Sequence, residues 1–254
     1  MIGNINSIET MGLVDGPGVR LVVFMQGCPM RCIFCHNPET WDTKEHLLMS
    51  PSEIVALALK YKSYFKNNGG ITFSGGEPLI QPAFLLETLK LCKENNINTC
   101  LDTSGVGLGD YDEILKYTDL VIYDIKAISK YDYHNITKGN IATTQKFLES
   151  CALNNTRLWI RQVIIPGIND NREYILKLKA YIKKIKHVDK IELLPYHKLG
   201  IGKYDKMGIE YPLRETKNMS KTRIKELSKI LNSKEDIWKL VFSQVVLIHH
   251  IMII

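Results

Sequence analysis

The sequence predicts an α/β fold in which parallel strands alternate with helices. Short apolar runs rich in β-branched residues alternate with longer stretches of helical periodicity across residues 19–232. Of the 254 residues, 45% are hydrophobic and 24% are charged, a composition typical of globular proteins that excludes disordered, collagen-like and coiled-coil classes. Polar and glycine-rich motifs follow the predicted strands, as they do in α/β enzymes.

Six segments have the pattern of buried strands. The first, residues 19–25, reads VRLVVFM and follows a glycine–proline–glycine turn. A continuous apolar run between turn residues is typical of a strand that is buried on both faces. The other five strands are expected at residues 71–74, 98–101, 120–125, 158–165 and 191–194.

Helical patterns connect these strands. The clearest starts at Ser50, which we expect to be an N-cap, with Pro51 in the first helical position and Glu53 closing a capping box. The alternation favours either an open doubly wound sheet or an incomplete barrel, and periodicity alone does not choose between them. The other helices are expected at residues 84–95, 111–117, 143–153, 173–186 and 221–232.

Residues 1–242 are expected to form a single domain, because no linker or repeat interrupts the pattern. Residues 243–254 form an atypical apolar tail that is too short to span a membrane. The chain has 33 Lys and Arg against 27 Asp and Glu, a net charge of +6 that does not call for a nucleic acid partner. The absence of a signal-peptide pattern leads us to expect a cytoplasmic protein with no membrane association.

Residues suited to chemistry cluster after the predicted strands. The carboxyl ends of parallel strands share one edge of a sheet, so these residues are expected to meet there. In chain order they are the loop that starts at Cys28, the Gly75-Gly76-Glu77-Pro78 turn, Asp102 and Thr103, Asp124 and Lys126, Arg161, and finally Tyr196 and His197.

Three of the six cysteines, Cys28, Cys32 and Cys35, form a C-x3-C-x2-C motif. Three thiolates are fewer than the four ligands of a closed structural site, and they suit a 4Fe-4S cluster with one iron left open. The alternatives are a zinc site completed by His36, or three incidental thiols. The remaining cysteines, Cys92, Cys100 and Cys151, lie on helix or strand patterns and are interpreted as core thiols.

These motifs together resemble those of the radical S-adenosylmethionine (SAM) enzymes. The cysteine motif carries an aromatic residue, Phe34, before its last cysteine, and Gly75-Gly76-Glu77-Pro78 matches the glycine-rich motif that meets the amino group of SAM. The chain resembles more closely the branch that installs glycyl radicals in partner enzymes. The matching stretches are residues 14–18, 35–37, 40–42, 99–103, 159–161 and 191–197.

The resemblance implies a partial (β/α)6 TIM-like barrel and an oxidoreductase activity. Members hold three irons of a 4Fe-4S cluster by the three cysteines, and SAM chelates the fourth iron. Reductive cleavage of SAM gives a 5′-deoxyadenosyl radical, which removes hydrogen from a glycine of the partner under anaerobic conditions. The implied protein substrate is pyruvate formate-lyase, an enzyme of anaerobic glucose metabolism. Flavodoxin or ferredoxin is the implied electron donor, and a monomer is expected.

The resemblance also implies roles for individual residues. Cys28, Cys32 and Cys35 would be the catalytic cluster ligands, and Asp15 would meet the partner. A monovalent cation, Na⁺ or K⁺, is a further hypothesis, with the alternative that the same carboxylates cap helices or pair with Lys126. The cation ligands would be Asp102, Thr103, Asp124 and the carbonyl of Ile122. The residues near SAM would be Phe34, Asn37, Gly75, Gly76, Glu77, Asp102, Lys126, Arg161 and His197.

Two alternative functions remain open from the sequence. No cysteine lies between Cys35 and Gly75, so the ferredoxin-like insertion that many related activators carry is absent. The nearer alternative is therefore an activator of anaerobic ribonucleotide reductase. The alternative from a different class is a non-catalytic zinc-binding module, which would have no use for the Gly75-Gly76-Glu77 motif.

Overall fold

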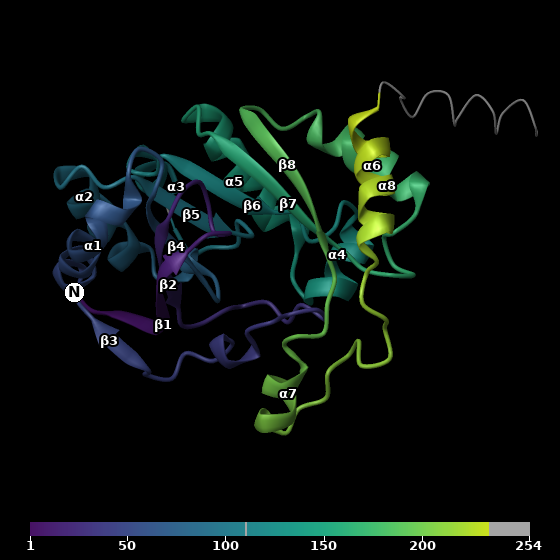
Figure 1. Ribbon diagram of the computed structural model, residues 1–254, viewed down its shortest axis with the longest axis horizontal. Coiled ribbons are helices and arrows are strands. Elements are labelled where there is room, and N and C mark those ends of the chain that lie inside the picture. Colours follow the sequence, from purple (N-terminus) through teal and green to yellow (C-terminus); the bar gives the residue numbers. More distant parts are fainter. Residues whose placement is uncertain (110, 234–254) are drawn as a thin grey trace, which may run out of the picture. The chain divides into compact units, whose positions relative to one another are not determined.

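The computed structural model describes residues 1–109 and 111–233 of the chain (Figure 1). They fall into two compact units. The first comprises Met1–Gln162, Lys186–Glu192 and Lys198–Arg214, and the second comprises Val163–Ile185, Leu193–His197 and, of the described residues after these, residues 215–233. The apolar tail at residues 243–254 lies outside the described residues, so the division into one domain and a tail stays a prediction.

The strands form one sheet of eight strands in the order β3-β1-β2-β4-β5-β6-β7-β8. From β2 through β7 the neighbouring strands pair in parallel, whereas β1 pairs antiparallel with both β2 and β3. The expected α/β class with parallel strands is thereby confirmed. The strands are β1 Gly3–Gly12, β2 Arg20–Met25, β3 Leu47–Met49, β4 Gly70–Gly75, β5 Thr99–Thr103, β6 Leu120–Asp124, β7 Leu158–Ile164 and β8 Val188–Pro195.

Helices connect the parallel strands in the expected way. Within the first unit α1 packs on α2 and α3 packs on α5, and within the second unit α6 packs on α8. Two short 3-10 helices, η1 (Pro38–Thr40) and η2 (Pro78–Ile80), follow β2 and β4. The α-helices are α1 Pro51–Phe65, α2 Pro82–Glu94, α3 Tyr111–Lys116, α4 Lys130–Thr137, α5 Ile141–Leu153, α6 Arg172–Ile182, α7 Ile201–Met207 and α8 Lys221–Asn232.

The expectation of six strands was wrong, because the described chain has eight. The main omission is β1, which alternates buried and partly exposed residues along GNINSIETMG. Its exposed positions are Ser7, Glu9 and Met11, and polar residues separate its apolar ones, so the strand lacks a continuous apolar run. The short strand β3 and the helices α4 and α7 were also not expected.

The core of the first unit lies along the central strands. Phe73 on β4, Leu101 on β5 and Ile122 on β6 are fully buried. Cys100 packs with Leu120 and Ile122 in one apolar cluster. The cysteines outside the motif, Cys92, Cys100 and Cys151, are all buried, as expected of thiols that serve as small apolar side chains. In the described part of the chain, no helix is long and apolar enough to cross a membrane.

The capping box at the start of α1 is confirmed. The backbone N–H of Glu53 donates to Ser50 Oγ at 3.3 Å, and the backbone N–H of Ser50 donates to Glu53 Oε2 at 2.7 Å. We predict that Ser50→Ala lowers the free energy of unfolding by about 1 kcal/mol in a urea titration. Ser63→Ala, at an exposed position inside the same helix, is the control and should leave stability unchanged or slightly raised. Equal stability of the two variants would contradict the role of the cap.

Candidate functional site

The loop that carries the cysteine motif starts at the end of β2 and is held by a buried amide. Gln26 is nearly fully buried, and its Nε2 donates to the carbonyls of Glu39 and Asp42 at 2.9 and 3.1 Å. The backbone N–H of Gly27 donates to the carbonyl of Thr40 at 2.8 Å. The two ends of the loop are therefore tied together, and the cysteines lie between them.

The three thiols of the motif are shielded from water. Burial raises the pKa of Cys28 and of Cys32 to about 12, and it also raises the pKa of Cys35. The backbone N–H of Asn37 donates to Cys35 Sγ at 3.4 Å, and the Trp41 side chain adds a second hydrogen bond. Thiols in this setting release their protons when a cation such as iron binds, because the positive charge of the cation stabilises the thiolates.

The donor set distinguishes an iron–sulfur cluster from zinc. In residues 1–109 and 111–233 no three His, Cys, Asp or Glu side chains gather into a group that could hold one metal ion. A zinc ion needs its four ligands around one point, whereas each thiolate of a 4Fe-4S cluster binds a different iron. Three thiols on one loop, of which Cys32 is buried and Cys28 and Cys35 are partly exposed, therefore fit the cluster better than the zinc alternative with His36.

The two glycines of the Gly75-Gly76 turn allow the loops after β2 and β4 to touch. Gly75 has a φ of +108°, and a Cβ added to it would lie 2.3 Å from the nitrogen of Met25. A Cβ on Gly76 would lie 2.1 Å from the carbonyl oxygen of Gly27. A side chain at Gly75 would clash with the end of β2, and one at Gly76 would clash with the start of the cysteine loop, so this pair lets the two segments pack against each other.

The carboxylate of Glu77 is buried and joins the loops after β4 and β5. Its Oε1 accepts hydrogen bonds from Thr103 Oγ1 at 2.5 Å and from the backbone N–H of Leu79 at 3.2 Å. Its Oε2 accepts from Ser104 Oγ at 2.6 Å and from the Ser104 backbone N–H at 3.0 Å. Burial raises the pKa of Glu77, and these four donors oppose the rise. Because protein groups occupy both oxygens, Glu77 acts on the site by holding its loops.

Charged residues of both signs lie at the ends of β5, β6 and β7. Lys126 Nζ donates to Asp124 Oδ2 at 2.6 Å and lies 5.6 Å from the ring centre of Phe34. Ser74 Oγ donates to Asp102 Oδ2 at 2.8 Å. Burial, together with the charge of Asp124, raises the pKa of Asp102 to about 7. An additional positive group at this edge would relieve the repulsion between the two carboxylates.

Arg161 connects this edge to the loop that carries Asp15. It lies beside Asp124 in the β6–β7 pairing, and its Nε donates to Glu192 Oε2 at 3.2 Å. Its Nη2 donates to the carbonyl of Val14. Burial would lower the pKa of Arg161, but the neighbouring carboxylates outweigh burial and raise it. The structure therefore brings the cysteine loop, the glycine pair, the acidic edge and the loop of Asp15 into one unit.

Three expected site residues have other surroundings. His197 follows the buried Tyr196 in the second unit, so its place near the cofactor stays a prediction. The hydroxyl of Thr103 donates to Glu77 and accepts a hydrogen bond from the backbone N–H of Gly105 at 2.9 Å. The carbonyl of Ile122 belongs to β6, where Ile122 pairs with Asp102 and Trp159.

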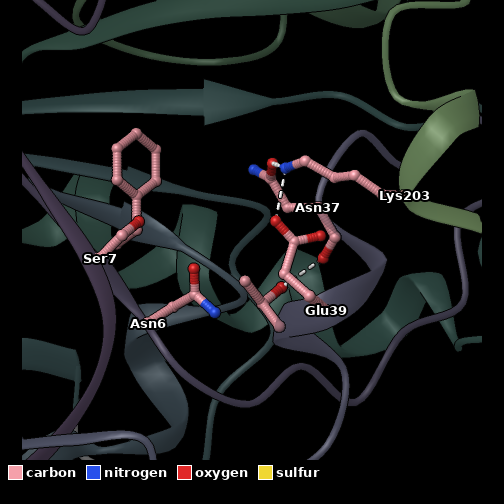
Figure 2. A pocket seen from close by; sticks show the side chains of 7 residues that line it. Asn6, Ser7, Asn37, Glu39 and Lys203 are labelled. Carbon is pink, nitrogen blue, oxygen red and sulfur yellow. Dashed lines mark hydrogen bonds and ion pairs between the residues drawn. The ribbon is translucent and has the colours of Figure 1, made fainter. Parts of the chain in front are cut away.

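Sequence analysis missed the contribution of α7. Tyr204 Oη donates to the carbonyl of Cys35 at 3.1 Å, and Lys203 Nζ donates to Asn37 Oδ1 at 2.8 Å and pairs with Glu39. Of these residues, Asn37, Glu39 and Lys203 line part of a pocket of about 190 Å³ (Figure 2). The short helix has no apolar periodicity, and only the flanking Gly200 and Gly208 hint at its ends. The pocket is lined by Asn6, Ser7, Phe24, Asn37, Glu39, Thr40 and Lys203.

Comparison with known protein families shows which superfamily the chain belongs to. The Radical SAM superfamily matches residues 22–178, more than half of the chain. The chain belongs to the radical SAM superfamily, which confirms the expected class and implies SAM and a 4Fe-4S cluster as its cofactors.

Individual relatives narrow this assignment to the pyruvate formate-lyase-activating enzymes. The enzyme of that name from Clostridium pasteurianum is 49% identical over 232 residues, which cover 91% of this chain and 98% of the relative. The one from Staphylococcus epidermidis is 39% identical, with 91% and 95% covered. Among solved structures, a domain of pyruvate-formate lyase-activating enzyme from Bacteroides vulgatus is similar at 24% identity and a TM-score of 0.53, covering 64% of this chain and 92% of that one.

A further structural neighbour supports the fold alone. A radical SAM methyltransferase from Sphaerobacter thermophilus is 16% identical with a TM-score of 0.63, covering 85% of this chain and 64% of that one. At identities below 25%, these solved structures are evidence for a shared fold only.

The role of Glu77 is testable by an isosteric substitution. Glu77→Gln puts an NH2 group against donors on Ser104 or on Thr103 and Leu79, so we predict a loss of about 1–3 kcal/mol in the free energy of unfolding. Chemical denaturation of both variants measures it, with the exposed Glu87→Gln as the matched control. A Glu77→Gln protein as stable as the control would show that the carboxylate does not hold the loops.

Proposed function

We propose that this chain activates pyruvate formate-lyase by generating a glycyl radical on it. The observation that carries the proposal is the loop of three cysteines, with Cys32 buried, that is fixed against the Gly75-Gly76 turn at the carboxyl edge of the sheet. The relatives at 49% and 39% identity, which span nearly the whole chain, support the same function. A reducing, anaerobic cytoplasm is the setting that an exposed iron of such a cluster requires.

The residues of the cysteine loop would hold the cluster. Cys28, Cys32 and Cys35 would each bind one iron, leaving the fourth iron for SAM. When bound and reduced by one electron, the cluster and SAM supply a 5′-deoxyadenosyl radical that removes a hydrogen atom from glycine. The N–H of Asn37 that donates to Cys35 Sγ would stabilise the thiolate. The burial of Cys32 would keep water from the cluster.

The remaining edge residues would bind and orient SAM. Gly75 and Gly76 present backbone without side chains, which permits close approach of the amino group. Lys126 and Arg161 carry the positive charge that the SAM carboxylate requires. Phe34 lies under Lys126 and would offer an apolar surface. Asn37, Asp102 and His197 complete the proposed SAM contacts, with Glu77 holding the turn that carries the glycines.

A monovalent cation at Asp102 and Asp124 is a finer part of the proposal. The two carboxylates repel each other and raise the pKa of Asp102, which a cation such as Na⁺ or K⁺ would relieve. Thr103 and the carbonyl of Ile122 would supply the other oxygen ligands. Lys126 already pairs with Asp124, so the cation would share that carboxylate.

The cation proposal predicts a dependence on the counter-ion. Replacing sodium and potassium by a large organic cation at constant ionic strength should lower the rate of SAM cleavage, because the bulky ion does not fit between carboxylates. The measurement is 5′-deoxyadenosine formation under reducing, anaerobic conditions. Equal rates in all the salts would remove the cation from the proposal.

The protein partners are proposed with the same function. Pyruvate formate-lyase would be the protein substrate and would meet the loop of Asp15. Arg161 donates a hydrogen bond to this loop at the carbonyl of Val14. A low-potential donor, flavodoxin or ferredoxin, would supply the electron. The chain would work as a monomer. An activator of anaerobic ribonucleotide reductase remains the second candidate, because it would use the same loop and glycine pair.

The function is tested by one anaerobic experiment on the reconstituted protein. With SAM and a reductant, pyruvate formate-lyase should acquire a glycyl radical that EPR detects, together with 5′-deoxyadenosine. Cys32→Ser should lose iron and activity, because a cluster ligand is removed, whereas Cys92→Ser, at an equally buried thiol of α2, should retain both.

Three results would contradict the proposal. Colourless, zinc-loaded protein that forms no 5′-deoxyadenosine would favour the zinc-binding module. Cleavage of SAM without a radical on pyruvate formate-lyase would contradict the proposed partner, and a radical on anaerobic ribonucleotide reductase would then identify the second candidate. Full activity of Cys32→Ser would contradict the proposed ligand set.

A further inference from the structure

A fully buried arginine lies behind the loop that carries Asp15. Arg20 begins β2 and is 0% exposed. Its Nε donates to Thr72 Oγ1 at 2.6 Å, its Nη1 to the carbonyl of Pro17 at 3.1 Å, and its Nη2 to the carbonyl of Ile71 at 2.6 Å. Further hydrogen bonds reach Asn68 and Asn98. A buried guanidinium is destabilising unless its N–H groups find acceptors, and here all three nitrogens of Arg20 have them.

The network binds backbone carbonyls of residues 13–18. Thr72 Oγ1 accepts from Arg20 and donates to the carbonyl of Asp15 at 2.7 Å. Arg20 also binds the carbonyl of Pro17 directly. The carbonyls on either side of Gly16 are therefore both fixed, one through Thr72 and one by Arg20 itself.

The shape of the loop leaves it little freedom. Gly18 has a φ of +71°, and a Cβ added to it would lie 2.5 Å from the nitrogen of Gly69. The loop thus rests directly on the turn before β4. On the outer side Arg161 donates to the carbonyl of Val14. Hydrogen bonds from Arg20 and Thr72 on one side and from Arg161 on the other therefore fix three carbonyls of this six-residue loop.

The outer face of this loop is unusual for a surface turn. Leu13 and Val14 are 71% and 75% exposed, although both are large apolar residues. Exposed apolar side chains on a rigid backbone suit the binding of another polypeptide, because little conformational entropy is lost on association.

We propose that Arg20 and Thr72 are positioning residues that hold residues 13–18 in the conformation that receives the protein substrate. The proposal rests on the proposed function, since the polypeptide is the glycine-bearing segment of pyruvate formate-lyase. Neither residue touches substrate. Both act by fixing the carbonyls of Asp15 and Pro17. The backbone held in this way sets the directions of the side chains of Leu13, Val14 and Asp15.

The test uses the reconstituted enzyme and a pair of substitutions at one buried hydroxyl. Thr72→Val keeps the shape and removes the hydrogen bonds, whereas Thr72→Ser keeps the hydroxyl. Thr88→Val is the matched control, because Thr88 is equally buried and its hydroxyl donates to the carbonyl of Phe84 in its own helix. Three quantities are measured: KM and kcat for glycyl-radical formation, SAM cleavage without partner, and hydrogen–deuterium exchange of the amides of residues 13–19.

The expected result separates partner binding from chemistry. Thr72→Val should raise KM for pyruvate formate-lyase by about tenfold, the effect of one lost buried hydrogen bond, while kcat and partner-free SAM cleavage stay at wild-type values. Its loop amides should exchange faster. Thr72→Ser and Thr88→Val should match wild type in all three measurements. If Thr72→Val does not fold, Arg20→Lys, which keeps the charge but cannot span both carbonyls, should give the same pattern.

The results that would overturn the proposal are distinct from failure of the proposed function. Wild-type KM and wild-type loop exchange in Thr72→Val would overturn it, as would an equal loss of kcat and of partner-free cleavage. Faster loop exchange with an unchanged KM would also overturn it. If the wild-type protein gives no radical on pyruvate formate-lyase, the proposed function fails, and with it the named partner, whereas the loop exchange still decides whether the network fixes the loop.

Discussion

The buried carboxylate of Glu77 is the interaction on which the candidate site depends. It receives four hydrogen bonds from the loops after β4 and β5, and the turn that precedes it is pressed against the cysteine loop at Gly27. A carboxylate without partners would be too costly at this depth, so the surrounding hydroxyls and amides must take fixed positions. The positions of three loops are thereby set by one side chain that need not touch a reacting atom.

The same principle recurs at both ends of the parallel strands. Gln26 ties the two ends of the cysteine loop, and Arg20 ties the loop of Asp15 to β4. Each loop is irregular, yet each is held by a buried polar side chain with satisfied hydrogen bonds. Loops fixed in this way are preorganised for a cofactor and a protein substrate, which lowers the entropy lost when either binds.

Much of the fold and part of the site could be predicted from the sequence. Strands such as β2 and β6 are continuous apolar runs, and the capping box at Ser50 is a local signal, so both were found. The Cys28–Cys35 motif and the Gly75-Gly76 turn depend on spacing and were also found. By contrast, polar residues separate the apolar residues of β1, and α7 is short with no periodicity, so neither gives a local signal.

The roles of buried polar residues could not be predicted for a physical reason. Glu77 belongs to a recognisable motif, but its partners Thr103 and Ser104 lie 26 and 27 positions away, and only the parallel sheet brings them together. Arg20 reads as one polar interruption in an apolar strand, although its acceptors come from four other segments. Long-range satisfaction of hydrogen bonds is a property of the folded chain and leaves no periodic trace in the sequence.

The central claim is that the thiols of Cys28, Cys32 and Cys35 hold a 4Fe-4S cluster whose fourth iron binds SAM. The most direct test is the EPR spectrum of the reduced, reconstituted protein before and after addition of SAM. Ligation of the open iron by the amino and carboxylate groups of SAM should change the signal of the reduced cluster, and Cys32→Ser should show no such cluster signal. A wild-type cluster signal that is identical with and without saturating SAM would contradict the claim.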